Sequence, residues 1–394
     1  MNRPSGGRAD AAPSYGGQAV LFATTRVLLN TMYRMVYPFL PVFGRALGVG
    51  LPALSLAVTL RSVTGCFSPL LATLADGLGR RAGMLSGLVI FTAGTAMVLI
   101  RPGFPAFVLC LVVTIVGKYV FDPAIQAHLG DRVPYARRGL VIALSELGWS
   151  VSFIAGVPAA GYLIERGGWR APFVPLTLLG ALAVALYARL IPRDSHHRRH
   201  YLGLAASLQA VVTFTPALLG LSVGLLATSA NEVINLVFGV WMEGAFDVKI
   251  AGLGAASAIV GVSELAGEIL VGALTDRLGK RRAIGIGLVL NSLAAAALPW
   301  LGTDVAGALT GLALFYVTFE FTMVSMIPLM TEILPGARAT LLAAYVAALS
   351  LGRAVGALIA PPLYAFGIGA CAVAALVFNQ LAWFTLRRLD PGRT

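Results

Sequence analysis

A ten-residue segment occurs twice in this 394-residue chain, each time between two long apolar stretches. Residues 72–81 read ATLADGLGRR and residues 272–281 read GALTDRLGKR, so the copies lie 200 positions apart, close to half the chain length. At the same offset, residues 30–44 align with residues 230–244. The chain is therefore a duplication, and many transporters form a binding site between two related halves in this way.

The apolar stretches are too numerous for a soluble domain. Hydrophobic residues make up 58% of the chain and charged residues 12%, against roughly a quarter charged in soluble proteins. A helix needs about 20 apolar residues to cross a bilayer. Twelve stretches meet this length: 19–43, 51–74, 83–101, 104–128, 139–164, 171–191, 211–240, 250–274, 283–302, 305–331, 339–365 and 367–387. We predict an all-α membrane protein with twelve transmembrane helices.

This pattern divides the chain into two halves with polar connections. We expect a cytosolic tail at residues 1–18, six helices in residues 19–191, a cytosolic linker at 192–210, and six helices followed by a short tail in 211–394. The first 17 residues have no apolar core, so they do not form a cleaved signal.

The net charge of +12 reflects membrane topology and not a nucleic-acid partner. Most of the 29 lysine and arginine residues lie in the tails and in alternate loops, including both copies of the repeat. Basic residues concentrate on the cytoplasmic side of membrane proteins. We therefore predict a multi-pass protein of the cell inner membrane with both termini in the cytoplasm.

Eleven charged side chains lie within the predicted helices. They are Arg26, Arg34, Arg61, Lys118, Asp122, Glu146, Glu232, Glu264, Glu268, Glu320 and Arg353. Each would cost at least ~2.5–3.5 kcal/mol at the bilayer centre, so they must face protein or water. Every third predicted helix has none, which indicates that the other eight helices surround a cavity. The first half carries mostly cations and the second mostly anions, a pattern that suits a zwitterionic or amphipathic solute, or protons on the acidic side.

The repeated segment resembles the cytoplasmic signature loop of the major facilitator superfamily, G-x-L-x-D-R/K-x-G-R/K-R/K. The second copy matches throughout, whereas the first has Ala72 in place of glycine and Gly77 in place of the basic residue. The resemblance covers residues 19–390. It implies two pseudo-symmetric six-helix bundles that rock around a central cavity, and by default a monomer.

The resemblance also implies a conformational latch at the repeated loops, in which each aspartate pairs with basic groups or a helix N-terminus. The residues that match this role are Asp76, Arg80, Arg81, Asp276, Arg277, Lys280 and Arg281. The other interpretation is that they serve only as helix caps and topology signals. Gly148, Gly156, Pro158 and Gly161 are similar to the glycine-proline motif of the family's exporters, but small residues at this spacing also allow close helix packing.

Two polar clusters at matching positions of the two halves are the first candidates for substrate contact. Asn30, Tyr33 and Arg34 lie within little more than one helical turn, and Asn231, Glu232 and Asn235 occupy the aligned helix. Further candidates are Arg61, Lys118, Glu320 and Arg353. The alternative is that these buried polar groups only bond one another.

Four carboxyl groups are candidates for proton coupling: Asp122, Glu264, Glu268 and Glu320. Glu264 and Glu268 are four residues apart, so their like charges repel and one is expected to hold a proton. The alternative is that Arg61 or Arg353 neutralises Glu264 and Glu268 as a fixed counter-ion. Asp122 is four residues from Lys118, which allows either a static ion pair or one that opens on protonation.

No metal or cofactor is predicted. Cys66, Cys110 and Cys371 lie in apolar stretches as packing residues, and His196, His197 and His200 belong to the polar linker. No Walker loop or HExxH motif is present, which argues against an ATP-driven transporter or a membrane enzyme, and a receptor would not need acid-base residues at mid-depth. We predict a proton-coupled exporter of small amphipathic organic molecules. The alternative is an uptake carrier or lipid translocator for anionic or zwitterionic solutes.

Overall fold

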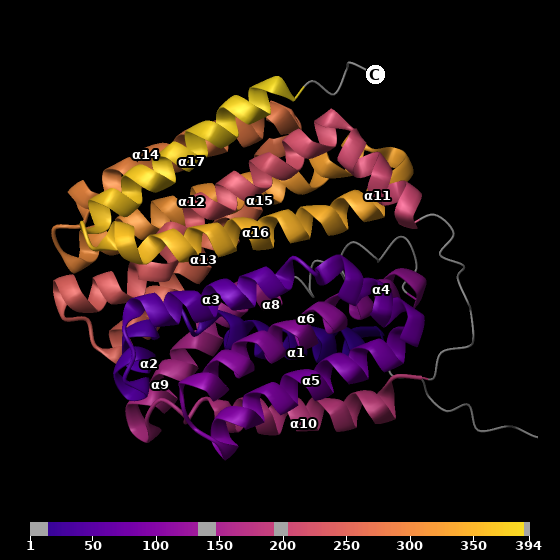
Figure 1. Ribbon diagram of the computed structural model, residues 1–394, viewed down its shortest axis with the longest axis horizontal. Helices are drawn as coiled ribbons and strands as arrows, with labels where there is room; N and C mark the ends of the chain where they lie inside the picture. The colour runs from indigo at the N-terminus through magenta and orange to yellow at the C-terminus, as the bar shows by residue number, and fades with distance from the viewer. Residues whose placement is uncertain (1–14, 133–146, 193–203, 390–394) are drawn as a thin grey trace, which may run out of the picture.

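Two helical bundles lie side by side in the computed structural model, which describes residues 15–132, 147–192 and 204–389 (Figure 1). The first bundle contains α1 (Tyr15–Arg34), α2 (Leu40–Leu47), α3 (Leu51–Gly65), α4 (Ser68–Leu78), α5 (Arg80–Ile100), α6 (Phe104–Arg132), α8 (Gly148–Val151), η1 (Ser152–Gly156), α9 (Val157–Gly167) and α10 (Phe173–Leu190). The second contains α11 (Leu204–Thr213), α12 (Thr215–Phe246), α13 (Ile250–Leu278), α14 (Lys280–Leu301), α15 (Val305–Ile333), η2 (Pro335–Ala337), α16 (Arg338–Tyr364) and α17 (Ile368–Arg388).

The prediction of an all-helical membrane protein is confirmed. Within the described ranges, nine helices are long and apolar enough to cross a membrane, or ten if the pair α2 and α3, bent by 114°, counts as one span. Each of the twelve predicted stretches is largely helical where it is described. The first and fifth predicted stretches are not among these candidate spans. In the first, α1 carries two arginines and several other polar residues. In the fifth, α8, η1 and α9 are short pieces of a broken helix.

The two halves repeat the same turns at equivalent positions. Gly79 and Gly279 precede α5 and α14 with φ of 92° and 80°, a region that favours glycine. Gly48 closes α2 and Asp247 closes α12, both in the left-handed conformation with φ of 66° and 53°. Asp is among the few side chains that tolerate this conformation. The duplication read from the sequence is thus also a duplication of backbone geometry.

The predicted linker, residues 192–210, contains helical structure. The short helix α11 begins within it, at Leu204. The segment LAASLQAVVT is rich in good helix formers, and α11 packs against α12 and α16. Tertiary contact therefore extends helical structure into the predicted linker.

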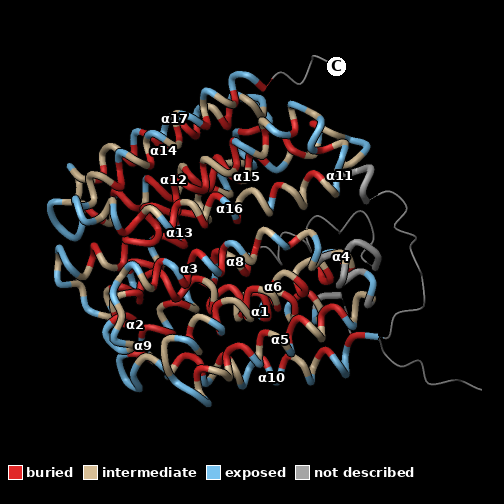
Figure 2. The backbone as a smooth tube through the Cα atoms, in the orientation of Figure 1, coloured by how far each residue is buried: buried red, intermediate tan, exposed pale blue. Residues whose placement is uncertain are grey.

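Buried residues follow the interior of each bundle and the boundary between the bundles (Figure 2). Large apolar residues such as Ile100, Leu178 and Val373 are instead exposed, by 82%, 65% and 62%. Exposed apolar side chains are expected where a helix faces lipid.

A buried amide pair joins three helices of the second bundle. The Asn291 amide donates to the carbonyl of Phe315 at 2.7 Å, and its oxygen accepts from the Asn379 amide at 2.7 Å. Both asparagines are 1% exposed. These bonds fix α14 against α15 and α17.

Replacing Asn291 by leucine is expected to lower the free energy of unfolding by about 1–3 kcal/mol, because the Asn379 amide loses its buried partner. Unfolding in mixed detergent micelles measures this change. Thr385→Val on α17, which removes an exposed hydroxyl bonded to Leu381, serves as the control and should have little effect. Equal stability of the two variants would contradict this role for the amide pair.

Candidate functional site: a polar network between the bundles

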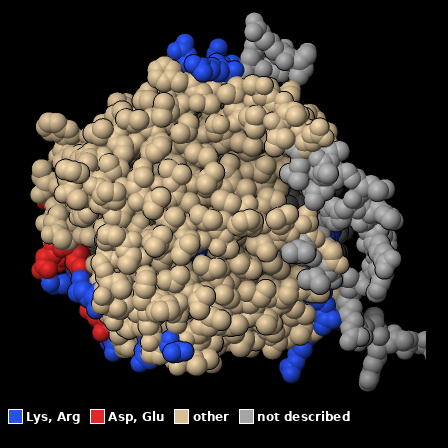
Figure 3. Space-filling view, viewed as in Figure 1, with Lys and Arg blue, Asp and Glu red and all other residues tan. Residues whose placement is uncertain are grey.

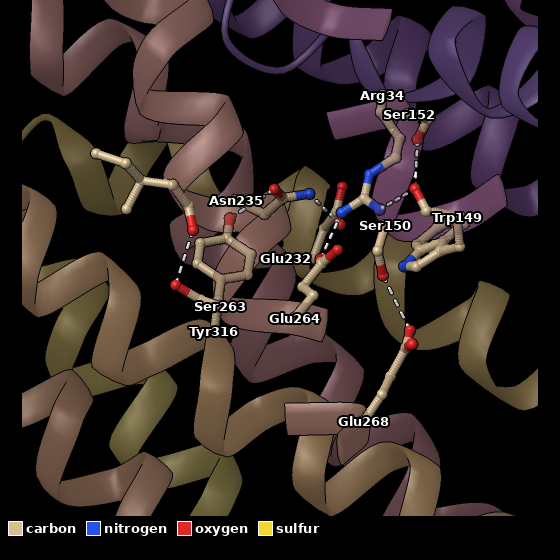
Figure 4. A network of polar contacts seen from close by, with 11 residues as sticks. Arg34, Trp149, Ser150, Ser152, Glu232, Asn235, Ser263, Glu264, Glu268 and Tyr316 are labelled. Carbon is tan, nitrogen blue, oxygen red and sulfur yellow. Dashed lines mark hydrogen bonds and ion pairs between the residues drawn. The ribbon is translucent and has the colours of Figure 1, made fainter. Parts of the chain in front are cut away.

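A buried ion pair connects the two bundles at the centre of the molecule. Arg34, the last residue of α1, contacts Glu264 of α13, and each residue is 3% exposed (Figure 4). The Arg34 guanidinium also donates to the carbonyl of Trp149 at 3.1 Å. It lies 4.2 Å from the ring centre of Trp149 and 3.5 Å from that of Phe153. Such a pair is tolerated away from water because its partners offset the loss of hydration.

Two more carboxyl groups, those of Glu268 and Glu320, lie in the same region as Glu264. Ser150 of α8 donates a hydrogen bond of 3.0 Å to Glu268, again between the bundles (Figure 4). Glu320 of α15 lies within electrostatic reach of both Glu264 and Glu268. The two helices approach closely there, because a Cβ placed on Gly267 would lie 2.9 Å from the Cβ of Glu320. The second Glu264 oxygen, Oε2, is buried with no hydrogen-bond partner among the described residues.

A second network between the bundles is centred on Glu232 of α12. Tyr37 donates its hydroxyl to Glu232 at 2.8 Å and accepts a hydrogen bond of 2.6 Å from Arg61. On the other side, the Asn235 amide donates to Glu232 at 3.3 Å, and Tyr316 donates to Asn235 at 2.7 Å. The chain of contacts runs from α3 through the α1–α2 turn to α12 and α15.

The Arg61 side chain stacks on Tyr33. Its guanidinium lies 4.0 Å from the Tyr33 ring centre and donates to the Tyr33 carbonyl at 2.9 Å. A cavity of about 10 Å³ beside it is lined by Arg61, Tyr33 and Lys118, together with apolar residues of α1 and α6. Arg353 of α16 lies within electrostatic reach of Tyr33 and Glu232.

The candidates on α6 belong to the first bundle alone. Lys118 pairs with Asp122 one turn later, and Arg26 of α1 approaches the same carboxylate at 3.6 Å. This arrangement corresponds to the self-neutralised pair considered from the sequence, with Arg26 as an additional partner. Glu146 lies outside the described residues.

The sequence predicted a wet cavity between a basic and an acidic side. In this structure the two sides meet directly, through Arg34 with Glu264 and Tyr37 with Glu232. Two further hydrogen bonds join the bundles, a buried one from Ser55 to the Ala357 carbonyl at 2.6 Å and a part-buried one between Tyr119 and Ser350 at 3.1 Å. The structure therefore describes a state in which the bundles are closed at this depth.

The bundles also meet at the end of the molecule that holds α2. Arg45 of α2 forms two hydrogen bonds of 2.5 and 2.9 Å with the carboxylate of Glu243 on α12. Closer to the centre, a Cβ on Gly239 would lie 2.4 Å from the Pro38 carbonyl oxygen. Only glycine permits this approach of α12 to the α1–α2 turn.

Basic residues of the repeated loops contact their own bundle. Lys280 pairs with Glu332 at the end of α15, Arg81 donates to the carbonyl of Ala188, and Arg281 donates to that of Arg387 at 2.5 Å. Asp276 and Arg277 are exposed, and Arg80 lies at the start of α5. Asp76 lies in α4. The Arg81 and Arg281 contacts are equivalent in the two halves.

The glycines of the fifth predicted helix mediate close packing on the first bundle. A Cβ on Gly148 would lie 2.9 Å from the Cβ of Arg26, and one on Gly156 would lie 1.9 Å from the hydroxyl of Thr31. Gly161 packs on Phe39 in the same way. A π-helical turn at Ser152–Gly156 accompanies this contact, and such turns often occur at functional sites.

Sequence reasoning missed the aromatic and hydroxyl residues of the network. Tyr37, Trp149, Ser150 and Phe153 contact the candidate charges, and Tyr316 contacts the candidate amide of Asn235. For Tyr37, the available signal in the sequence was its position four residues after the candidate Tyr33. The side-chain amides of Asn30 and the Nδ2 of Asn231 are buried without a partner among the described residues, which is unusual for polar groups in proteins.

Comparison with known proteins places these features in a family. The model of the Major Facilitator Superfamily matches residues 22–357 and 220–394. A similar relative is the Bacillus subtilis (strain 168) protein named uncharacterized MFS-type transporter YwfA, 25% identical over 366 residues that cover 90% of this chain and 88% of the relative. Another is the inner membrane transport protein YdhP of Escherichia coli O157:H7, 24% identical over 338 residues that cover 84% of each chain.

A solved structure shares the fold. The bacterial homologue of the human lysosomal transporter Spinster, in its inward-facing and occupied conformation, superimposes with a TM-score of 0.75 at 15% identity, covering 96% of this chain and 98% of that one. Its inward-facing and unoccupied conformation gives a TM-score of 0.73 at 16% identity, covering 96% of this chain and 95% of that one.

Proposed function

The chain belongs to the major facilitator superfamily of secondary transporters, and on that premise we propose that it exports small amphipathic organic molecules in exchange for protons. The observation that carries the proposal is the buried pair of Arg34 and Glu264, each on a different bundle. In alternating access the two bundles must separate on one side of the membrane and then on the other. Because the two charges lie on different bundles, protonation of Glu264 changes an interaction that holds the bundles together.

Protonation of Glu264 removes the charge that neutralises Arg34. Loss of one partner from a buried pair costs about 3–5 kcal/mol, and about 5.5 kcal/mol moves a two-state equilibrium from 1:99 to 99:1. One proton at this position is therefore sufficient to change which conformation predominates. The buried oxygen Oε2 of Glu264 supplies a place for the proton, and Glu268 and Glu320 supply neighbouring carboxyl groups.

The surroundings of the pair favour a substrate that is partly aromatic or apolar and partly polar. Rings of Tyr33, Trp149 and Phe153 stack on the buried guanidiniums. The amides of Asn30 and Asn231 lie on aligned helices of the two bundles, with hydrogen-bonding capacity unused by the described residues. An amphipathic molecule uses both kinds of contact when the bundles part.

Replacing Glu320 by glutamine is expected to reduce pH-gradient-driven efflux to the level of protein-free liposomes, because the carboxyl group can no longer exchange a proton. Efflux of a cationic dye from proteoliposomes, measured with and without the gradient, tests this. Glu165→Gln, at an exposed carboxylate of α9, is the matched control and should behave as the parent. Undiminished gradient-driven efflux in both Glu320→Gln and Glu264→Gln would exclude proton coupling through this site.

A second candidate is uptake or translocation of an anionic or zwitterionic solute, including a lipid. The two cations Arg61 and Lys118, which lie beside Tyr33 at one small cavity, favour it, because such groups are suited to a carboxylate or phosphate. Neutralising Arg34, Arg61 and Lys118 should then abolish anion binding and spare cationic compounds. Loss of cationic export with anion binding retained supports the exporter.

We propose further that both termini face the cytoplasm, as the basic loops indicate, and that the protein works as a monomer of the inner membrane. Asp76, Arg80, Arg81, Asp276, Arg277, Lys280 and Arg281 are proposed to stabilise the closed cytoplasmic side. The pairing of Lys280 with Glu332 supports a role for this region in holding α14 and α15 together.

A further inference from the structure

A groove on the outer surface of the second bundle combines basic and apolar side chains. It lies between α14 and α17, near the start of α14 and the end of α17, and has a volume of about 550 Å³. The residues that line it are Arg281, Arg282, Gly285, Ile286, Val289, Leu290, Trp383, Leu386 and Arg387. Three arginines and no acidic residue are in this described set, so its charge is not neutralised locally.

The groove lies far from the transport site and faces away from the other bundle. Helices α14 and α17 form the edge of the molecule opposite the first bundle (Figure 1). At that edge, where α17 ends, a cluster of basic side chains projects from an otherwise uncharged surface (Figure 3). Ile286 and Leu290 are 43% and 44% exposed one and two turns further along α14. The basic end therefore continues into a surface that faces the bilayer core.

Two of the three arginines contact the helices that form the groove. Arg281 donates a hydrogen bond of 2.5 Å to the carbonyl of Arg387. The Arg387 guanidinium lies 4.8 Å from the ring centre of Trp383, a cation–π distance that orients its planar group. The arrangement resembles a built anion site more than a set of free surface charges.

The first bundle supplies an internal comparison. Arg81 donates to the Ala188 carbonyl as Arg281 does to that of Arg387, so these two contacts are structurally equivalent. In the first bundle, however, Ala82 stands at the position of Arg282 and Ala188 at that of Arg387. A general excess of positive charge at this end of the chain does not explain why two additional arginines occur at these positions in one bundle only.

We propose that the groove between α14 and α17 binds an anionic phospholipid. Arg282 and Arg387 contact the headgroup phosphate, and an acyl chain lies along Ile286, Val289 and Leu290. Arginine suits phosphate because its planar guanidinium donates two parallel hydrogen bonds. Basic pockets between membrane helices are known to take acidic lipid headgroups. The bound lipid then bridges the start of α14 and the end of α17.

Native mass spectrometry of the detergent-solubilised protein tests the proposal, with dioleoylphosphatidylglycerol and dioleoylphosphatidylcholine as probes. The parent protein should bind phosphatidylglycerol about 30-fold more tightly than phosphatidylcholine, the scale expected from two arginines that each contribute about 1 kcal/mol near an anionic headgroup. The double variant Arg282→Gln/Arg387→Gln should bind both lipids equally. Phosphatidylglycerol with brominated acyl chains should quench the Trp383 fluorescence of the parent, as judged against Trp383→Phe.

The matched control is Arg189→Gln/Arg388→Gln, which removes two exposed arginines outside the groove. It should keep the preference for phosphatidylglycerol. An equal loss in both double variants would show that only overall charge matters, and equal binding of the two lipids by the parent would show no headgroup selection. Displacement of the lipid by millimolar inorganic phosphate would assign the groove to a soluble anion. Each of these three results overturns the proposal.

Discussion

Replacing Glu264 by glutamine is expected to lower the free energy of unfolding of the closed state by about 3–5 kcal/mol, because that state then buries Arg34 without a counter-charge. Both side chains are 4% exposed, so water does not replace the lost partner. Hydrogen bonding to Trp149 and stacking on Phe153 retain part of the stabilisation. Equilibrium unfolding in mixed micelles, with helix content as the signal, measures the change.

The exposed pair between the same bundles is the internal control. The side chains of Arg45 and Glu243 are 61% and 24% exposed, and such pairs contribute at most about 1 kcal/mol. Glu243→Gln should therefore be close to neutral. Replacing both members of the buried pair, as in Arg34→Met/Glu264→Leu, should recover much of the stability lost in Glu264→Gln. A double variant as unstable as the single one would contradict the argument from unpaired charge.

The Gly239→Ala variant is expected to reduce transport strongly while the two bundles still fold. Its new Cβ would lie 2.4 Å from the oxygen and 2.8 Å from the carbon of the Pro38 carbonyl. Both atoms belong to the backbone of the opposite bundle, so the steric overlap is removed only if the bundles move apart. Overpacking of this kind costs about 1–3 kcal/mol, which corresponds to a shift of about 5–150-fold against the closed state.

Cross-linking across the closed end measures this shift. A bifunctional thiol reagent should join Arg45→Cys and Glu243→Cys readily in the parent and much more slowly with Gly239→Ala. Gly244→Ala on the same helix is the matched control, since a Cβ there meets nothing within 4 Å. The control should gain up to about 1 kcal/mol of stability from helix propensity and transport normally. Cross-linking at the parent rate in Gly239→Ala would exclude this role of the close contact.

The charges of the candidate site were recognisable in the sequence, but their partners were not. Arg34, Glu232 and Glu264 attract notice because an ionised group inside an apolar stretch is costly unless it has a purpose. The contact of Arg34 with Glu264 and of Glu232 with Tyr37 joins residues 230 and 195 positions apart. No local pattern encodes which face of each helix turns toward the other bundle.

The aromatic residues of the site could not be singled out from the sequence, because such residues are common in membrane proteins. Tyrosine and tryptophan are common at membrane interfaces as anchors, so Trp149 and Tyr316 carried no distinguishing signal. Their role depends on stacking and on hydroxyl direction, which are properties of packed helices. Lys118 and Asp122 illustrate the opposite case, because a spacing of four residues places the pair together on any helix.

Apolar length, the repeated loop and the placement of charge were enough to specify a helical membrane protein with two related halves, because each depends on composition along the chain. The approach of α12 to Pro38, the pairing between the bundles and the lipid-facing groove of α14 and α17 depend instead on how helices rotate and dock. Those choices are made by side-chain packing between segments distant in sequence, and so they became visible only in three dimensions.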